Sequence, residues 1–126
     1  MAVRINPQAL RAHQVAVALA VHSVRIARRL RGIGAPSIGN QLIRSALSVP
    51  SNIAEACGRG RLREFRAFLR YAQGSAQEML TQLRVVRRSG LASESALLAM
   101  ESRAVTLLKM LASLEQHPPP SITRGD

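Results

Sequence analysis

Two glutamates and a row of polar side chains have the types and spacing that could support acid–base chemistry. Gln41, Ser45, Ser48, Asn52 and Glu55 recur at intervals of four, three, four and three residues, which places them on one face of a helix. Further along, the same spacing relates Ser75, Glu78 and Gln82. Catalysis would require Glu55 and Glu78 to face each other in an accessible pocket that raises the pKa of one carboxyl. We instead expect Gln41, Asn52, Glu55 and Glu78 to belong to a polar network that fixes helix register or lines a subunit contact.

Metal binding and nucleophilic catalysis have little support in this chain. Di-iron bundles use Glu-x-x-His pairs, and the sequence contains none. Cys57 is the single cysteine, so neither an internal disulfide nor a cysteine-based metal site can form. Its small neighbours favour a buried, inert thiol. We therefore predict no catalytic residue, no metal and no cofactor, and we expect that the protein is not an enzyme.

The charge of the chain is its strongest compositional signal. Eighteen basic residues, all but one of them arginine, stand against seven acidic ones and give a net charge of +11. Such an excess indicates anionic partners, nucleic acid before acidic membrane. The apolar residues are mainly Ala, Leu and Val, with two Phe, one Tyr and no Trp, and this composition suits closely packed helices better than a sheet.

Four segments have the apolar periodicity of helices, and we predict helices over residues 7–31, 37–57, 61–89 and 93–116. Asn6 followed by Pro7 is a typical helix start, and Ser93 is a typical N-cap. Pro50 lies inside the second pattern, where we expect a kink without a break. Residues 118–126, which begin with three prolines, are predicted to form a flexible tail.

Short connections between helices of similar length predict antiparallel neighbours. The expected fold is therefore all-α: one left-handed, up-down-up-down four-helix bundle. In that topology, the ends of the first and third helices meet the starts of the second and fourth at one pole. Seven arginines then gather at this pole, with Glu94 as the nearest acid: Arg25, Arg28, Arg29, Arg31, Arg84, Arg87 and Arg88.

Two explanations of this arginine cluster remain open. Cations near helix C-termini interact favourably with the helix macrodipole, so the cluster could serve stability alone. Alternatively, it binds phosphates, which would make affinity depend on salt. Because Phe65, Phe68 and Tyr71 are expected in the core, no aromatic platform for bases is foreseen, and binding would follow the backbone without sequence preference.

The segment from Ser45 to Arg59 contains Ser48-Val49-Pro50-Ser51-Asn52-Ile53-Ala54-Glu55, and Glu64-Phe65 and Gly74-Ser75-x-x-Glu78 follow. This pattern resembles the signature of the bacterial four-helix bundle family encoded in 23S rRNA intervening sequences. The resemblance covers nearly the whole chain and implies a pentameric bundle without a catalytic motif. The chain is also distantly similar to accessory proteins of diversity-generating retroelements, which implies nucleic acid and a nucleic-acid enzyme as partners.

Assembly and location can also be predicted. Six apolar residues lie off the main stripes and give the helices wide apolar faces: Leu19, Ile26, Leu47, Leu69, Leu80 and Leu98. We take this as a sign of a homo-oligomer. Seven apolar residues at 15–21 are too few for a membrane span, so we expect a cytoplasmic protein without a membrane partner. The predicted function is a non-enzymatic oligomeric scaffold that binds RNA or DNA backbone, and the alternative is a purely protein–protein scaffold.

Overall fold

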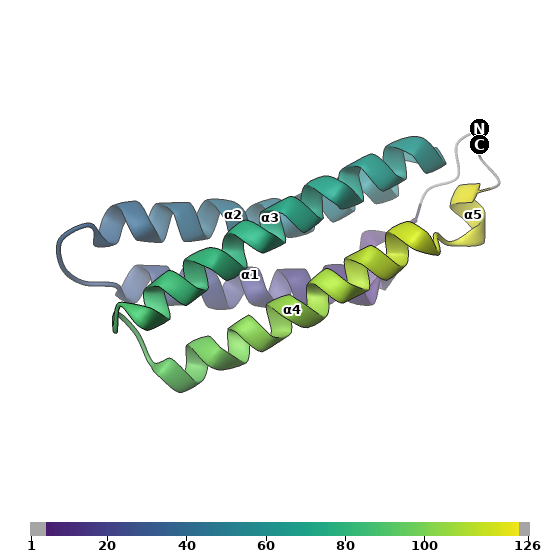
Figure 1. Ribbon diagram of the computed structural model, residues 1–126. Coiled ribbons are helices and arrows are strands. Elements are labelled where there is room, and N and C mark those ends of the chain that lie inside the picture. The colour runs from purple at the N-terminus through teal and green to yellow at the C-terminus, as the bar shows by residue number, and fades with distance from the viewer. Residues whose placement is uncertain (1–4, 124–126) are drawn as a thin grey trace.

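Four long helices form an antiparallel bundle in the computed structural model, which describes residues 5–123 (Figure 1). In chain order the elements are η1 (Pro7–Ala9), α1 (Arg11–Arg29), α2 (Ala35–Arg59), α3 (Leu62–Arg88), α4 (Glu94–Gln116) and α5 (Pro120–Thr123). The predicted all-α, up-down-up-down architecture is confirmed. Among the described residues, no helix is long and apolar enough to cross a membrane.

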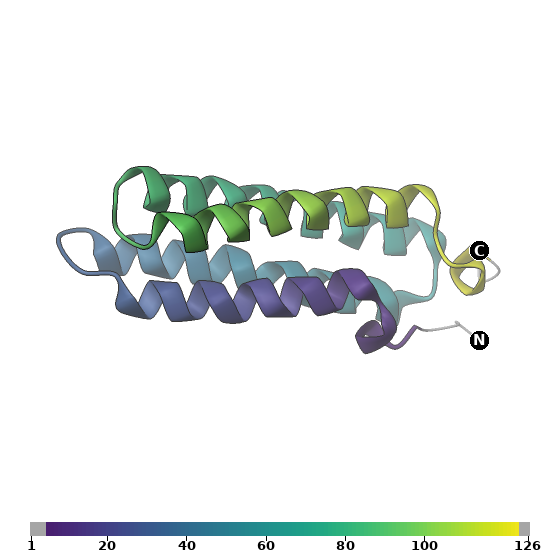
Figure 2. The same ribbon diagram turned by 90° about the horizontal axis from the view of Figure 1, so that it is seen from below.

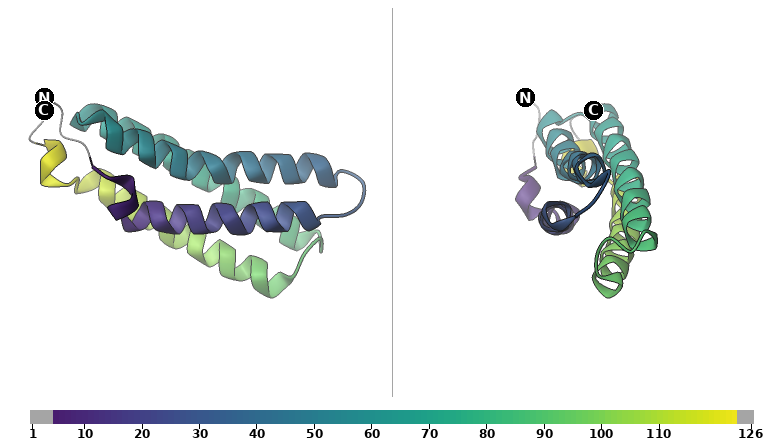
Figure 3. Two further views of the ribbon diagram at one scale, coloured as in Figure 1. Left: turned by 180° about the vertical axis from the view of Figure 1, so that it is seen from behind. Right: turned by 90° about the vertical axis from the view of Figure 1, so that its left-hand side faces the viewer.

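Each long helix packs against two others, and α1 and α3 lie on one diagonal of the bundle (Figures 2 and 3). The side between α1 and α4 is the least closely packed. Phe65, Leu42, Ile53 and Leu107 are fully buried at the centre. Alanines at every fourth position of α1, residues 12, 16 and 20, are also buried and let the neighbouring helices approach closely.

The first helix starts later than the sequence predicted. Asn6 does act as a cap, but its side chain accepts a hydrogen bond from the Gln8 amide within the short 3₁₀ helix η1. Leu10 is then extended, and α1 begins at Arg11. The Ile5 amide donates to the Cys57 carbonyl at 3.1 Å, which ties this entry segment to α2 and accounts for the turn before α1.

The second helix is longer than predicted and continues through Pro50. It begins two residues before Ser37 and ends at Arg59, and Gly60 follows in the left-handed region with φ of 78°. Ser51 Oγ donates to the Leu47 carbonyl, and Asn52 Nδ2 donates to the Ser48 carbonyl, both at 2.9 Å. These side chains supplement the backbone bonds next to the one that Pro50 cannot make.

Two expectations about apolar residues need correction. In the tail, for which we predicted a flexible segment over residues 118–126, Ile122 is fully buried and Pro120–Thr123 form a helical turn that contacts α3. Burial of the Ile122 side chain explains this order; residues 124–126 lie outside the described part.

Of the residues chosen as evidence for oligomers, Leu19, Leu69 and Leu80 are buried within the single chain. Ile26 is half-buried, and only Leu47 and Leu98 are exposed, each to 47%.

Candidate nucleic-acid interface

The α1–α2 and α3–α4 connections lie at the same end of the bundle (Figure 1). The structure therefore places the seven predicted arginines at that end, which we call the basic pole: Arg25, Arg28, Arg29, Arg31, Arg84, Arg87 and Arg88. All of them except Arg87 are exposed. The topology thus brings the predicted residues to one pole, but the arginines from α1 and those from α3 have different surroundings.

The arginines from α1 are free of carboxylates. Arg25, Arg28 and Arg29 line one surface depression of about 410 Å³. Within the described residues, the side chains of these three arginines and of Arg31 form no ion pair and no hydrogen bond. At the same pole, α2 begins without an acidic residue in its first turn, so the positive end of its dipole adds to the potential. This part of the pole is a concentrated and uncompensated positive charge.

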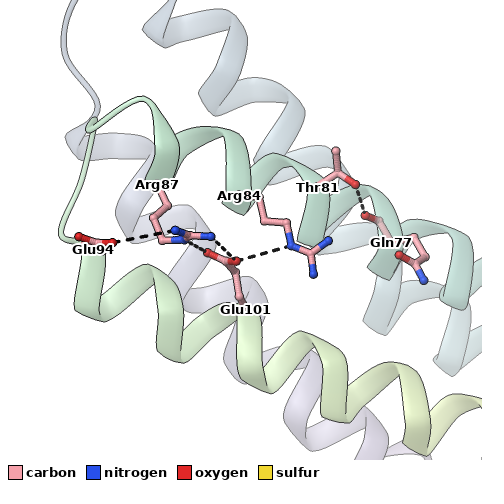
Figure 4. Close-up of polar contacts among 6 residues, drawn as sticks. All are labelled: Gln77, Thr81, Arg84, Arg87, Glu94 and Glu101. Carbon is pink, nitrogen blue, oxygen red and sulfur yellow. Dashed lines mark hydrogen bonds and ion pairs between the residues drawn. The ribbon is translucent and has the colours of Figure 1, made fainter.

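Two arginines from α3 are instead engaged by α4. Arg87 makes a bidentate pair with Glu101, with distances of 2.5 Å from Nε and 3.2 Å from Nη2 (Figure 4). Arg84 Nε lies 3.6 Å from the same carboxylate, and Glu94 lies at 4.0 Å from Arg87. The hydrogen bond to Glu101 is the main reason that the pKa of Arg87 is raised above its ordinary value. The sequence predicted Glu94 as the nearest acid to the pole, but the structure shows that Glu101 is nearer. Among the α3 arginines of the pole, Arg88 alone has no partner in the described part.

Sequence reasoning missed Glu101, although the sequence carried a signal. Glu101 lies four residues after Leu97 and three before Ala104, both of which are fully buried. It therefore occupies a core-facing position of α4 and is itself only 8% exposed. A charge at such a position requires a partner, because an unpaired buried carboxylate is strongly unfavourable.

At the opposite pole, several arginines are engaged by carboxylates. Arg59 pairs with Glu55 at 3.0 Å and lies near Glu64 at 3.9 Å. Around Glu115, the Arg70 guanidinium and the Gln73 amide each donate to the carboxylate, and Arg66 donates to the backbone carbonyl. The hydrogen bond from Gln73, followed by that from Arg70, holds the pKa of Glu115 below its ordinary value despite partial burial. Arg11, Arg61 and Arg63 at this pole are also exposed without an ion-pair partner among the described residues, but they do not line one shared depression as Arg25, Arg28 and Arg29 do.

The predicted polar network forms only in part. Between α2 and α3, Ser45 Oγ donates to Gln82 Oε1 at 2.6 Å, and Ser75 Oγ donates to Ser48 Oγ at 2.8 Å. Asn52 joins this network through the Ser48 hydroxyl at 3.0 Å. The other three predicted members lie outside it: Glu55 pairs with Arg59, while Gln41 and Glu78 are exposed and line two adjoining depressions of about 420 Å³ each.

The two carboxylates of the enzyme hypothesis do not face each other. Ser48 lies opposite Ser75, and from there Glu55 and Glu78 lie in opposite directions along the bundle. At 1.5 Å per residue, their separation along the axis is about 15 Å. Among the described residues, no group of three His, Cys, Asp or Glu side chains is placed to hold a metal ion.

Burial makes the one cysteine a poor nucleophile. Cys57 is fully buried in α2, and desolvation raises the pKa of its thiol to about 11. Reactive cysteines have lowered pKa values and are partly exposed. The Cys57 side chain is part of the hydrophobic core.

The fold and the sequence have relatives. The chain is similar to the crystal structure of a protein of unknown function from the S23 ribosomal protein family of Bacteroides thetaiotaomicron, with a TM-score of 0.75 and 20% identity over 83% of this chain and 95% of that one. At that identity, the likeness establishes the fold alone. None of the curated proteins matches the chain significantly. The profile of the family described as 23S rRNA-intervening sequence protein matches residues 8–113. The chain belongs to this 23S rRNA-intervening sequence protein family.

Proposed function

We propose that this protein is a non-enzymatic, oligomeric interaction protein whose basic pole binds the phosphate backbone of nucleic acid. The observation that carries the proposal is the group Arg25, Arg28 and Arg29, which shares one depression and has no carboxylate partner among the described residues. Cations near the last carbonyls also stabilise a helix end, so the binding test below is what separates the two roles. Three guanidinium groups on one surface match the donor geometry that phosphates require.

Binding of this kind is electrostatic and without sequence preference. Phosphate contacts position a protein on nucleic acid but carry no direct sequence information. Each phosphate contact also releases counterions, so affinity should fall steeply as salt rises. A nucleic-acid enzyme as a further partner was expected only from the resemblance to retroelement accessory proteins, which no comparison shows, and it stays a prediction.

The test is a fluorescence-anisotropy titration of mixed-sequence RNA and DNA at several salt concentrations. The variant R25A/R28A/R29A should bind much more weakly, and the slope of log K against log salt should become shallower by up to about 2.7. The matched control is R11A/R63A/R103A, which removes the same charge from exposed arginines on α1, α3 and α4. If both triple variants lose affinity equally, total charge rather than the basic pole is responsible, and the proposal is wrong.

A purely protein–protein scaffold remains the second candidate, because one surface favours it. A depression of about 420 Å³ between α2 and α3 is lined by Ile38 and Val85 together with amide side chains. Val85, Leu47 and Tyr71 on these two helices are about half exposed, at 47–59%. We propose that this side takes part in a homo-oligomer, for which the family resemblance suggests a pentamer. Light scattering that gives the mass of one chain at micromolar concentration would contradict this assembly.

A further inference from the structure

The α1–α2 connection presents one apolar side chain at the tip of the basic pole. Ile33 has a relative exposure of 108%, the highest among the exposed large apolar residues of the described part. Arg31 lies two residues before it, and Arg28 and Arg29 end the preceding helix. The connection extends beyond the end of the bundle (Figures 1 and 3). Single exposed apolar side chains are common on protein surfaces, but this one lies at the same pole as four arginines that have no carboxylate partner in the described part.

The tip is narrow, and its base is fixed. Gly32 and Gly34 have φ values of 106° and 82°, which other residues rarely adopt, and nothing lies within 4 Å of where their Cβ atoms would be. Leu30 and Ala35, on either side of the tip, are each only 6% exposed, and the Ala35 amide donates to the Gly32 carbonyl at 3.2 Å. Ile33 is therefore presented on a short turn without bulky neighbours.

We infer that the basic pole binds double-stranded nucleic acid and that Ile33 enters the minor groove of the duplex as an apolar wedge. This inference rests on the proposed function. Proteins that bind the minor groove insert apolar side chains, isoleucine among them, between base steps and kink the duplex. The minor groove of DNA is about 6 Å wide, which a single apolar side chain can enter, and arginine favours a narrow minor groove.

The arrangement of aromatic residues disfavours a single-stranded ligand. Proteins that bind single strands stack bases on aromatic side chains next to a basic groove. In the described residues, Phe65, Phe68 and Tyr71 all lie in the first half of α3, near the opposite pole. Tyr71 is exposed, contrary to our expectation, but the Arg59 guanidinium covers the Phe68 ring at 4.8 Å and is itself paired with Glu55. The basic pole thus offers phosphate contacts without a stacking platform.

A membrane surface is also a poorer fit than a duplex. Even a myristoyl chain gives only marginal membrane binding. The Ile33 side chain has four carbons and is the only large apolar side chain that this connection exposes. A wedge in a duplex, in contrast, needs a single apolar side chain, because the arginines provide the attachment.

The experiment compares wild type, Ile33→Ala and Ile33→Ser on end-labelled duplex DNA, duplex RNA and the separate single strands. We expect wild type to prefer a duplex, and both variants to bind it about five- to tenfold more weakly. Because the lost contact is apolar, the salt slope should stay unchanged, unlike that of R25A/R28A/R29A. Energy transfer between the duplex ends should report a bend that the Ile33 variants reduce. Val17→Ala, which removes another exposed apolar side chain on α1, is the matched control.

The possible failures are distinguishable. Absence of binding to any nucleic acid at low salt overturns the proposed function and this inference together. Arginine-dependent binding that is tighter for single strands, or that is unaffected at Ile33, overturns only the wedge. Binding to vesicles of anionic phospholipid that requires Ile33, without binding to a duplex, identifies a membrane surface instead. Since Ile33 makes no core contact, thermal melts should show that both variants fold like wild type.

Discussion

Arg87 of α3 and Glu101 of α4 form a bidentate ion pair at the edge of the basic pole (Figure 4). The Glu101 side chain is 10% exposed and the Arg87 side chain 23%, so the pair is largely withdrawn from water. It joins two helices across their interface and removes Arg87 from the charge available to a ligand. Substitutions of Arg84 or Arg87 would therefore mix a loss of binding with a loss of stability, and for this reason the binding test uses arginines of α1.

Glu101→Gln should lower the free energy of unfolding by about 1–3 kcal/mol, because the neutral amide leaves Arg84 without a charged acceptor and leaves Arg87 with Glu94 alone, at 4.0 Å. Urea denaturation at neutral pH measures the effect. Glu94→Gln is the matched control. The Glu94 side chain is 74% exposed, and its ion pair with Arg87 is long, at 4.0 Å, so this variant should change the free energy of unfolding by less than about 0.5 kcal/mol. Equal effects of the two variants would show that the buried Arg87–Glu101 pair contributes no more to stability than the exposed pair with Glu94.

Two buried serines, one with a hydrogen-bond partner and one without, should change the stability of the protein in opposite directions when each is replaced by alanine. The Ser23 hydroxyl is buried in α1 and has no hydrogen-bond partner in the described part, so Ser23→Ala should stabilise the protein by about 1 kcal/mol. The Ser45 hydroxyl donates a hydrogen bond to Gln82, so Ser45→Ala should destabilise the protein by about 1–2 kcal/mol. Thermal and urea unfolding of both variants give the two signs, and destabilisation by Ser23→Ala would contradict the structure.

Glu115 should contribute to acid sensitivity. Because its pKa in the folded protein is lowered from the ordinary value of 4.5, its stabilising effect is complete above that value and is lost as pH falls through the lower, folded pKa. Glu115→Gln should therefore be less stable than wild type at neutral pH, and the difference should shrink below about pH 4. Unfolding measured across this pH range tests the prediction. A difference that is independent of pH would assign the loss to packing instead.

Cys57 should resist thiol reagents in the folded protein. With a pKa of about 11 and full burial, only about one thiol in a thousand would be ionised at pH 8, even before access is considered. Modification by a chromogenic disulfide should be slow in buffer and rapid in denaturant. Rapid reaction of the native protein would show that α2 opens near its C-terminal end.

The sequence by itself determined the four helices and the pole at which the arginines gather. Both follow from local information: apolar periodicity identifies the helices, and short connections make their neighbours antiparallel. Ser93 was predicted as the cap of α4 and does accept a hydrogen bond from the Ala96 amide. Helix limits were less accurate, because the start of α1 depends on a bond between Ile5 and Cys57 that is distant in sequence.

Only the tertiary structure decided which arginines are free and which apolar residues are covered. Periodicity shows that a residue faces inward, but it does not show which side chain of which helix it meets. The Arg87–Glu101 pair, the burial of Leu69 and Leu80, and the burial of Ile122 all depend on such contacts between elements. The same holds for Ile33: its position between two glycines is evident in the sequence, but its full exposure follows from the folding of Leu30 and Ala35 against the bundle on either side.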